Sequence, residues 1–572
     1  MVDRPGRTDW GVFGIAAVLA TAFIAWGLLA TESLQAFSET ALQVLVRNGG
    51  WVFVTAGTGF VVFGLILAFT RFGRIRLGDD DEKPEFRTSS WIAMMFAAGM
   101  GIGLMFYGVA EPLQHFTTPP PGTNVAPGSQ EALGAAMATS LFHWTLHPWA
   151  IYATVGLALA YSSYRRGRKQ LLSSAFVPLF GERTANGTVG KIIDILAVFA
   201  TVFGTAASLG IGATQIAAGL QQVGWVGSMS NTLLVAIITV LIAAFVISAV
   251  SGVSKGIQWL SNSNMVLAIV LAAFLFVVGP TVFILDLIPN AVGSYVSDFG
   301  MMISRTGSVG GEDTTEWLST WTIFYWAWWI SWAPFVGMFI ARISRGRTVR
   351  QFVGGVLMVP SAISLVWFAI LGGTALFEQR NGVGLADASG EEEQLFGMFD
   401  QLPFSGVLSV LAMLLIINFF VTSADSASVV VGSLSQQGSA RPRMWVVVFW
   451  GVVIGGVAIS MLLAGGDEAL TGLNNTTIIA ASPFVIVVIL LCFSLMKDLR
   501  QDRVMLVESR SAEVLEEAVI YGTEEHDGNF HLEVTPSEPS DDSDDSGDSG
   551  DSGDSGDSGK EESRSSSSSD ES

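Results

Sequence analysis

Charged residues are scarce in this sequence, and cysteine is almost absent from it. Only 14% of the 572 residues are charged, whereas 50% are hydrophobic, and the mean hydropathy is +0.52. This composition with long uncharged runs excludes a set of ordinary soluble domains. The single cysteine, Cys492, lies in an apolar run, which excludes a disulfide framework and a thiolate metal cluster.

The sequence also lacks the residue patterns of an enzyme and of a cleavable signal peptide. No nucleophile–base pair and no metal triad is evident, so an enzyme is disfavoured. The first apolar run, residues 10–30, is long enough to cross a bilayer and has no clear cleavage site, so we expect it to remain as a span.

Basic residues are scarce at the end of the chain, where the negative charge gathers. Residues 541–572 contain 12 acidic and 2 basic residues, so they carry −10 of the net charge of −21. The repeated DSG triplets and the serine run cannot bury a core, and we expect this segment to be disordered. An acidic tail also speaks against a nucleic-acid partner.

Long uncharged runs recur along the rest of the chain and predict an all-α polytopic membrane protein. About 20 apolar residues are needed to cross the hydrocarbon core of a bilayer. Twelve transmembrane helices are predicted, at residues 10–30, 51–70, 90–110, 132–162, 191–222, 232–250, 257–288, 317–341, 350–376, 402–435, 441–464 and 475–497.

Positive charge alternates between the two sides of this arrangement. The loops after odd-numbered spans hold only Arg47, Arg305 and Arg380, whereas the other loops hold clusters such as residues 165–169 and 345–350. Because cytoplasmic loops carry the excess of Lys and Arg, both termini are expected in the cytoplasm of a multi-pass cell-membrane protein.

The predicted spans contain a repeated feature five spans apart. Span three carries AAGMGIG at residues 97–103, and span eight carries SWAPFVG at residues 331–337. Because five is odd, the second half would enter the membrane inverted, and interrupted helices at matching places mark a transporter site near the bilayer midplane. We therefore take Gly99, Gly101 and Gly103 as candidate substrate-binding residues, because glycine lets backbone approach a ligand. The alternative for these glycines is close helix packing.

Six domains follow from this organisation. They are a cytoplasmic N-terminus at 1–9, two peripheral transmembrane helices with a cytoplasmic loop at 10–89, a first inverted repeat at 90–288, an external loop at 289–316, a second inverted repeat at 317–497, and an acidic, mostly disordered cytoplasmic tail at 498–572. Apolar residues recur at helical spacing near the external loop, from Ile288 to Phe299, which predicts an amphipathic surface helix. Residues 498–520 are expected to form a short cytoplasmic helix.

Span eight is unusually rich in tryptophan. Residues 317–341 contain six tryptophans, and Trp326, Trp328 and Trp329 lie near the middle of the span, away from the interfaces where tryptophan anchors helices. Pro334 is expected to disturb the helix at that depth. Large π faces beside an interrupted helix suit a permanent cation without a hydrogen to donate, such as a quaternary ammonium. The alternative is aromatic packing between helices.

Span four carries a second aromatic group in FHWTLHPWAIY, residues 142–152. Trp149 and Tyr152 share a helix face at i, i+3, and the disturbance at Pro148 would bring Trp144 near them. His143 and His147 have an i, i+4 spacing that can bind a metal, but no third ligand is evident. The alternative is a pair of buried histidines with satisfied hydrogen bonds.

Hydroxyl groups gather on spans five and ten. Thr201, Thr205 and Ser208 lie on one helical face, and Thr422 and Ser423 lie in the corresponding span of the second half. Hydroxyl and carbonyl oxygens suit Na⁺ without a buried carboxylate. The alternative is that these side chains bond back to their own helices.

Three carboxylates within or near the predicted spans, Asp194, Asp286 and Asp425, are functional candidates because a charge is costly there. Asp286 is alternatively placed near the outer surface, and Asp425 alternatively caps or orients the site in span ten.

Taken together, four segments resemble the betaine/choline/carnitine transporter family. They are residues 324–350, 142–152, 97–112 and 419–428, and the likeness extends over about residues 10–497. The resemblance implies a LeuT-like five-plus-five inverted repeat in spans 3–12, alternating access, and a homotrimer in the lipid bilayer.

The resemblance also implies roles for individual residues. An aromatic box for a trimethylammonium group is implied at Trp144, Trp149, Tyr152 and Trp329, with Trp328 as a neighbouring contact and Trp332 on the outward path. Two Na⁺ sites are implied, one at Ala97, Met100, Phe419, Thr422 and Ser423, and one at Thr201, Thr205 and Phe335. Na⁺ would be the coupling ion, and no covalently bound cofactor is expected.

Two departures from the family refine the expectation. Many choline-transporting members have an acidic residue where this chain has Gly103, which favours a zwitterion such as glycine betaine. Osmosensing members have basic C-terminal tails, so osmotic activation through such a tail is not carried over to this acidic one. The sequence therefore favours Na⁺ symport of glycine betaine; the alternatives are a choline or carnitine carrier or exchanger, and a non-transporting membrane receptor on the same scaffold.

Overall fold

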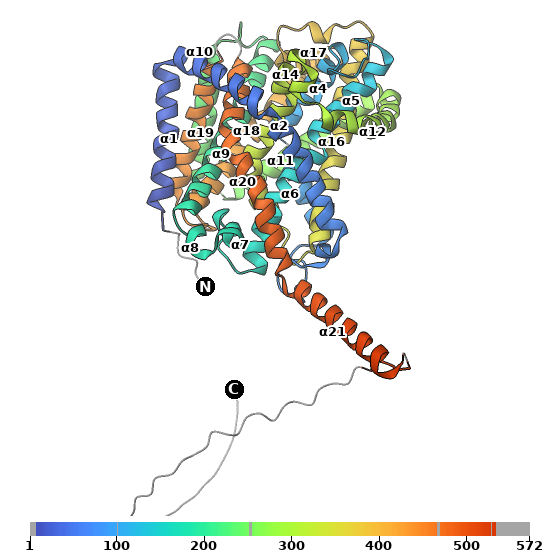
Figure 1. The fold of residues 1–572 in the computed structure, drawn as a ribbon. Helices are drawn as coiled ribbons and strands as arrows, with labels where there is room; N and C mark the ends of the chain where they lie inside the picture. Colours follow the sequence, from blue (N-terminus) through green and yellow to red (C-terminus); the bar gives the residue numbers. More distant parts are fainter. Residues whose placement is uncertain (1–6, 100, 251–253, 466–468, 528, 534–572) are drawn as a thin grey trace, which may run out of the picture. The chain divides into compact units, whose positions relative to one another are not determined.

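Helices account for every regular element in the part of the chain that the computed structural model describes, residues 7–99, 101–250, 254–465, 469–527 and 529–533. The chain divides into two units, Met1–Val507 and Glu508–Ser572. The first unit is a helical bundle in which the start of α1 and the end of α20 lie at the same end, whereas α14 and α17 lie at the opposite end (Figure 1). The second unit contains most of α21.

The α-helices of the two units vary widely in length. The long ones are α1 (Trp10–Leu29), α2 (Thr31–Phe69), α3 (Thr88–Gly99), α4 (Ile102–Thr117), α5 (Gln130–Trp144), α6 (Leu146–Ala160), α9 (Thr188–Gln222), α10 (Asn231–Val250), α11 (Ser254–Val278), α12 (Thr281–Ser304), α15 (Phe324–Arg342), α16 (Val349–Arg380), α17 (Glu391–Asp400), α18 (Ser405–Ser435), α19 (Met444–Leu463), α20 (Ala469–Arg500) and α21 (Arg503–His526).

Short helices connect them. They are the α-helices α7 (Val177–Phe180), α8 (Glu182–Ala185), α13 (Gly307–Gly310) and α14 (Glu312–Leu318), the 3-10 helices η1 (Arg71–Arg74), η3 (Ser173–Phe176) and η5 (Leu385–Asp387), and the π-helices η2 (Tyr161–Arg165) and η4 (Ser319–Ile323).

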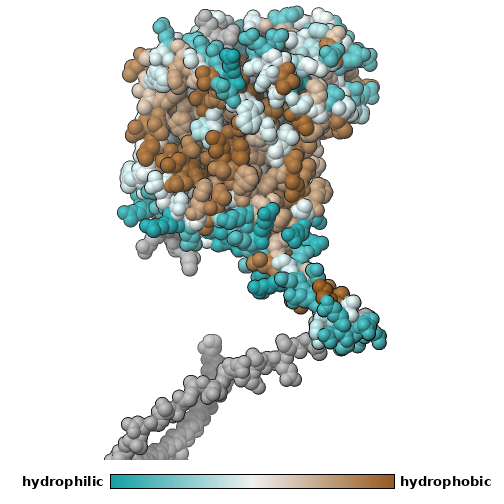
Figure 2. Space-filling view, viewed as in Figure 1, coloured by the Kyte–Doolittle hydropathy of each residue, from teal (hydrophilic) through white to brown (hydrophobic). Residues whose placement is uncertain are grey.

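A broad belt of hydrophobic residues surrounds the middle of the bundle on the face shown in Figure 2, with hydrophilic residues gathered at both ends. Among the described residues, nine helices are long and apolar enough to cross a bilayer, and ten are counted when the bent pair α11 and α12 forms one span. A chain with this many apolar helices is a multi-pass membrane protein.

The two predicted spans outside that count coincide with broken helices. Predicted span 90–110 is divided into α3 and α4, and predicted span 132–162 is divided into α5 and α6, so neither half reaches 18 residues. Twelve spans and the inverted repeat therefore remain predictions. The first break falls in the glycine segment, as expected, because Gly101 adopts an extended conformation just before α4.

Three details of the sequence interpretation were wrong. The expected disturbance at Pro334 is absent, since α15 runs through it to Arg342, and the irregular turn is the π-helix η4 instead. The break in predicted span four lies at Thr145, three residues before Pro148. Pro148 itself fits into the first turn of α6, because the backbone nitrogens of that turn have no partner within the helix. The segment after α11 turns by 107° at residues 279–280, so its surface helix begins at Thr281 and not at residue 289.

Glycine allows α6 and α15 to pack closely, and this contact positions the aromatic residues of both helices. A Cβ atom at Gly156 would lie 2.6 Å from Cγ1 of Ile340, and one at Gly337 would lie 3.0 Å from the backbone nitrogen of Gly156. Such distances are too short for a side chain, so the two backbones meet directly. The close contact brings Trp149 and Tyr152 of α6 alongside the tryptophans of α15.

An ion-pair network ties the end of α6 to the end of α20. Arg165 binds both carboxylate oxygens of Asp502 at 2.9 Å, and the Tyr161 hydroxyl donates to Asp502 Oδ2 at 2.7 Å. Arg166 donates to Asp498 Oδ1 at 3.0 Å, and Arg168 binds both carboxylate oxygens of Asp498. Burial alone would raise the pKa of Asp502, but the hydrogen bonds from Arg165 and Tyr161 hold that pKa below its usual value.

Candidate functional site

A cavity lies where the broken helices meet α15. Its empty volume is about 620 Å³, with the open space at its mouth included. It is lined by Gly101, Ile102, Gly103, Leu104, Trp144, Pro148, Trp149, Tyr152, Ser208, Trp328, Trp329, Trp332, Val336, Ser364 and Ser423.

The two helix breaks open this cavity. Gly101 is extended between α3 and α4, so the backbone of residues 101–104 reaches the cavity wall. Thr145 has non-helical dihedral angles between α5 and α6, which allows Trp144 and Trp149 to line the same space from two helices. Irregular backbone within a membrane bundle is tolerated where it lines such a cavity.

The predicted aromatic residues come together in the cavity. Trp328 and Trp329 stack with ring centroids 4.8 Å apart, and the edge of Trp144 meets Trp329 at 4.9 Å. Tyr152 contacts Trp149 at 5.4 Å and Trp329 at 6.4 Å, both edge to face. All five residues line the same cavity, as the sequence predicted, and their π faces suit a cation that cannot donate a hydrogen bond.

Three indole N–H groups around the cavity have partners that fix the orientation of their rings. Trp329 donates to the backbone oxygen of His143 at 3.1 Å, and Trp328 donates to Ser208 Oγ at 3.1 Å. Trp332 donates to the backbone oxygen of Gly204 at 2.8 Å. Because these three donors are occupied by the protein, the rings of Trp328, Trp329 and Trp332 present carbon faces and edges to the cavity.

Residue 103 must be glycine because the rings of Trp328 and Trp144 leave no space for a side chain. A Cβ atom at this position would lie 2.7 Å from Cη2 of Trp328 and 2.8 Å from Cη2 of Trp144. Both contacts are too short, so any side chain must displace a ring of the aromatic group. The same crowding applies to an aspartate, so the absence of an acidic residue here has a steric reason as well as an electrostatic one.

We therefore expect Gly103→Ala to weaken substrate binding by roughly tenfold, because displaced rings lose part of a contact worth about 1–2 kcal/mol. Substrate affinity should be measured on purified protein, with Gly354→Ala on α16 as the matched control. A Cβ atom at Gly354 has no neighbour within 4 Å, and Gly354 does not line the cavity, so this control should bind nearly as the wild type does. Equal losses in the two variants would contradict the steric argument.

The predicted Na⁺ ligands are only partly brought together. Ser423 lines the cavity, whereas Thr201 Oγ1 donates to the backbone oxygen of Ala197 at 2.8 Å and Thr422 Oγ1 donates to that of Asn418 at 2.8 Å. These bonds are the alternative that the sequence left open. Thr422 Oγ1 also accepts from Asn264 Nδ2 at 3.2 Å, so each hydroxyl keeps at least one lone pair for a cation. Thr205 and Phe419 are buried and Phe335 is half-buried. Met100 lies outside the described residues, as do the side-chain surroundings of Ala97 and Gly99.

The three candidate aspartates have separate surroundings. Asp194 accepts hydrogen bonds from the backbone nitrogen and the hydroxyl of Ser173, at 3.0 and 2.7 Å, so it caps the turn η3. Asp286 is exposed on α12, and Asp425 is half-buried on α18, where its backbone oxygen accepts from Ser428. None of the three lines the aromatic cavity described above.

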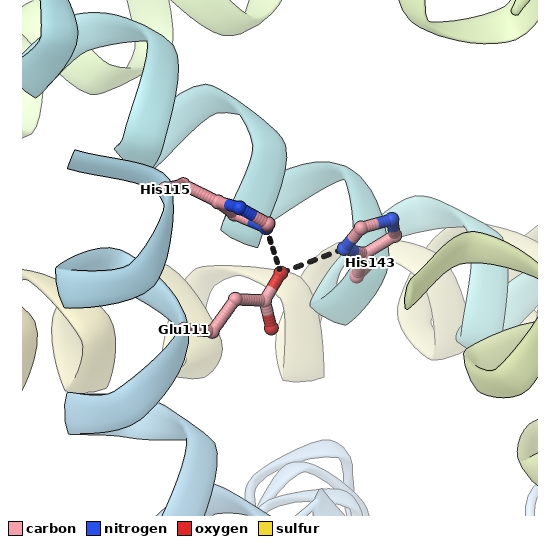
Figure 3. Close-up of side chains that lie close together, drawn as sticks. All are labelled: Glu111, His115 and His143. Carbon is pink, nitrogen blue, oxygen red and sulfur yellow. Dashed lines mark hydrogen bonds and ion pairs between the residues drawn. The ribbon is translucent and has the colours of Figure 1, made fainter. Parts of the chain in front are cut away.

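A buried polar cluster behind the cavity was missed by the sequence interpretation (Figure 3). Glu111 Oε1 lies 2.6 Å from His143 Nδ1 and 3.4 Å from His115 Nε2, and all three side chains are fully buried. Span three was expected to end at residue 110, one residue before Glu111, but α4 continues to Thr117. A Glu and a His at i, i+4 inside an apolar segment was the signal that could have identified it.

The two histidines of span four therefore lie in different environments. His143 contacts Glu111 and, through Nε2, the hydroxyl of Thr322 at 3.0 Å, so the statement that no third ligand lies nearby was wrong. His147 stacks on Trp326 with ring centroids 4.8 Å apart, and its Nε2 lies 3.5 Å from the hydroxyl of Thr58. A shared metal site for this pair is not formed.

Comparisons with known proteins show the family to which this chain belongs. A family model described as "BCCT, betaine/carnitine/choline family transporter" matches residues 11–504. The chain is 47% identical to the betaine/ectoine transporter LcoP of Corynebacterium glutamicum over 93% of this chain and 84% of that protein. It is 44% identical to the glycine betaine transporter OpuD of Bacillus subtilis over 86% of this chain and 94% of that protein. A solved structure of a Na⁺-coupled sialic acid symporter aligns with 79% of this chain and 86% of its own, at 14% identity and a TM-score of 0.41.

Proposed function

The chain belongs to the betaine/carnitine/choline family of transporters, and from this membership we propose that it imports a quaternary-ammonium compatible solute, in the first place glycine betaine, by Na⁺ symport with alternating access. Its relatives are named as transporters and not as enzymes.

The aromatic cavity is the observation that carries the substrate proposal. Trp144, Trp149, Tyr152 and Trp329 surround the trimethylammonium group, whose positive charge is spread over methyl surfaces and is attracted by π faces. The residues 101–104 of the broken helix offer backbone N–H groups to the carboxylate of glycine betaine. Trp328 would be a neighbouring contact of the bound substrate, and Trp332 would lie on the outward path.

The coupling proposal rests on neutral oxygens close to this cavity. Ser423 on α18 lines it, and Thr422 is its neighbour in the chain. Thr201 and Thr205 lie on one face of α9, which packs against both α15 and α18. Hydroxyl oxygens together with backbone carbonyls suit a Na⁺ ion, whose charge could then be coupled to substrate binding.

We extend the proposal to the arrangement in the membrane. Both termini would lie in the cytoplasm, because the basic loops lie on their side, and spans 3–12 would form the LeuT-like inverted repeat. The protein would work as a homotrimer, as the family resemblance implies.

Counterflow in proteoliposomes tests the proposal against its alternatives. Vesicles loaded with unlabelled solute are given labelled glycine betaine, with choline, carnitine and ectoine as competitors, in Na⁺ or in K⁺ buffer. We expect glycine betaine to exchange in Na⁺ and to be displaced poorly by choline. Preferential choline or carnitine exchange that is independent of Na⁺ would favour the carrier or exchanger, and binding without any exchange would favour a receptor.

A further inference from the structure

We propose that Glu111 is the positioning residue of the aromatic cavity: its carboxylate holds Trp144 in place and sets a fixed negative charge behind the ring. The identity of the substrate rests on the proposed function, whereas the geometry around Glu111 does not depend on it. The carboxylate does not line the cavity itself, whereas Trp144 does.

The hydrogen bonds of Glu111 are arranged as those of an ionised carboxylate. Oε2 accepts from Trp144 Nε1 at 2.7 Å and from the Tyr325 hydroxyl at 2.6 Å. Oε1 lies 2.6 Å from His143 Nδ1. An indole N–H can only donate a hydrogen bond, and an ionised carboxylate can only accept one. Oε2 of Glu111 is therefore a suitable acceptor for the indole of Trp144.

These bonds connect the carboxylate to both sides of the cavity. Trp144 meets Trp329 edge to face at 4.9 Å, and Tyr325 stacks on Trp329 at 5.8 Å with an interplanar angle of 13°. His143, the third partner, accepts the indole N–H of Trp329 with its backbone oxygen at 3.1 Å. One buried side chain therefore fixes Trp144 directly and Trp329 through two neighbours.

The charge of Glu111 also strengthens the attraction between the ring of Trp144 and a cation. An N–H group bonded to an anion is polarised, which raises the electron density of the indole π system. A denser π face attracts a cation more strongly, and in a cavity without water this attraction is weakly screened. The effect acts on the positive headgroup and leaves a neutral group of the same shape unaffected.

The alternative use of the same atoms is a metal site, and the distances speak against it. The ligand atoms of Glu111, His115 and His143 lie within 4.8 Å of one another, and such a donor set suits Zn²⁺. However, two ligands at about 2.0–2.2 Å from one tetrahedral ion stand more than 3 Å apart, whereas Oε1 and Nδ1 are 2.6 Å apart, which is a hydrogen-bond distance.

The first experiment tests the geometry without any substrate. The chain has 17 tryptophans, and labelling their indole nitrogens with ¹⁵N gives one N–H resonance for each in detergent. Trp144→Phe identifies the Trp144 signal, which should lie at the downfield edge in the wild type because its acceptor is charged. Glu111→Gln should move this signal upfield, and Glu378→Gln, a buried carboxyl on α16 outside the cluster, should not move it.

The second experiment tests the charge with two ligands of one shape. Glycine betaine and 3,3-dimethylbutanoate differ in the central atom of the headgroup, which is N⁺ in the first and carbon in the second. We expect Glu111→Gln to raise the Kd for glycine betaine about tenfold, or about 1.4 kcal/mol, and to leave competition by the analogue with the uncharged headgroup unchanged. Tyr325→Phe removes one bond to Glu111 but keeps the charge, so its effect should be smaller.

The outcomes separate this proposal from the proposed function. If the wild type binds no quaternary ammonium, the proposed function fails, and the Trp144 resonance still decides whether Glu111 holds the ring. A Trp144 signal that stays in place in Glu111→Gln overturns the positioning role. Equal losses of affinity for both ligands overturn the role of the charge, and stoichiometric Zn²⁺ that disappears in Glu111→Gln overturns both.

Discussion

Replacing Trp329 by leucine should weaken glycine betaine binding about thirtyfold while the protein remains folded. Trp329 lies in the middle of the aromatic group, with Trp328 stacked on it and the edges of Trp144 and Tyr152 against it. A cation–π contact without water is worth about 2 kcal/mol or more, which corresponds to roughly a thirtyfold change in affinity. Leucine fills part of the volume but has no π face, so the loss should fall on the positive headgroup.

The measurement is the Kd of purified protein for glycine betaine, together with a thermal unfolding curve. Trp149→Leu should show a loss of similar size, because Trp149 lines the same cavity from α6. Trp225→Leu is the matched control, since that side chain is 67% exposed and lies outside the cavity. Unchanged affinity in both cavity variants would reject the aromatic box.

The second large effect concerns Na⁺. The double replacements Thr201→Ala/Thr205→Ala and Thr422→Ala/Ser423→Ala should each raise the Na⁺ concentration for half-maximal uptake by about tenfold or more. Each lost oxygen should contribute on the order of 1 kcal/mol, and neutral oxygens offer no net charge to compensate. The aromatic cavity should persist in both variants, so binding at very high Na⁺ should remain.

A matched control for this prediction lies on α5. Thr139 and Ser140 are buried neighbours whose hydroxyls donate to their own helix at 2.8 and 3.0 Å, much as Thr201 and Thr422 do. Thr139→Ala/Ser140→Ala should leave the Na⁺ dependence unchanged. If this control shifts as far as the other two, the hydroxyls of α9 and α18 act only through helix packing. By linkage, if Na⁺ raises the affinity for glycine betaine by a given factor, glycine betaine must raise the affinity for Na⁺ by the same factor.

The sequence predicted the aromatic cavity well because its signal is local. Tryptophans in the middle of an apolar run have few roles, and five of the predicted residues, Trp144, Trp149, Tyr152, Trp328 and Trp329, line one cavity. The break at Gly101 was equally visible, since three glycines in five residues cannot hold a regular helix cheaply.

Other features depend on how the chain packs and were predicted wrongly or missed. Pro334 was expected to interrupt a helix, but α15 continues through it. The matching interruptions that suggested an inverted repeat are therefore not equivalent, since only the first is a break in the helix. Glu111 was overlooked because its partners come from α5 and α15, so only the folded chain shows that its carboxylate is satisfied.

The most direct test of Na⁺-coupled glycine betaine transport is accumulation in proteoliposomes under an inward Na⁺ gradient. Vesicles loaded with K⁺ buffer are diluted into Na⁺ buffer with labelled glycine betaine, and into K⁺ buffer as the control. We expect the Na⁺ gradient alone to drive glycine betaine to an internal concentration above the external one, and a Na⁺ ionophore to abolish this. Equal accumulation with and without the Na⁺ gradient would contradict the account.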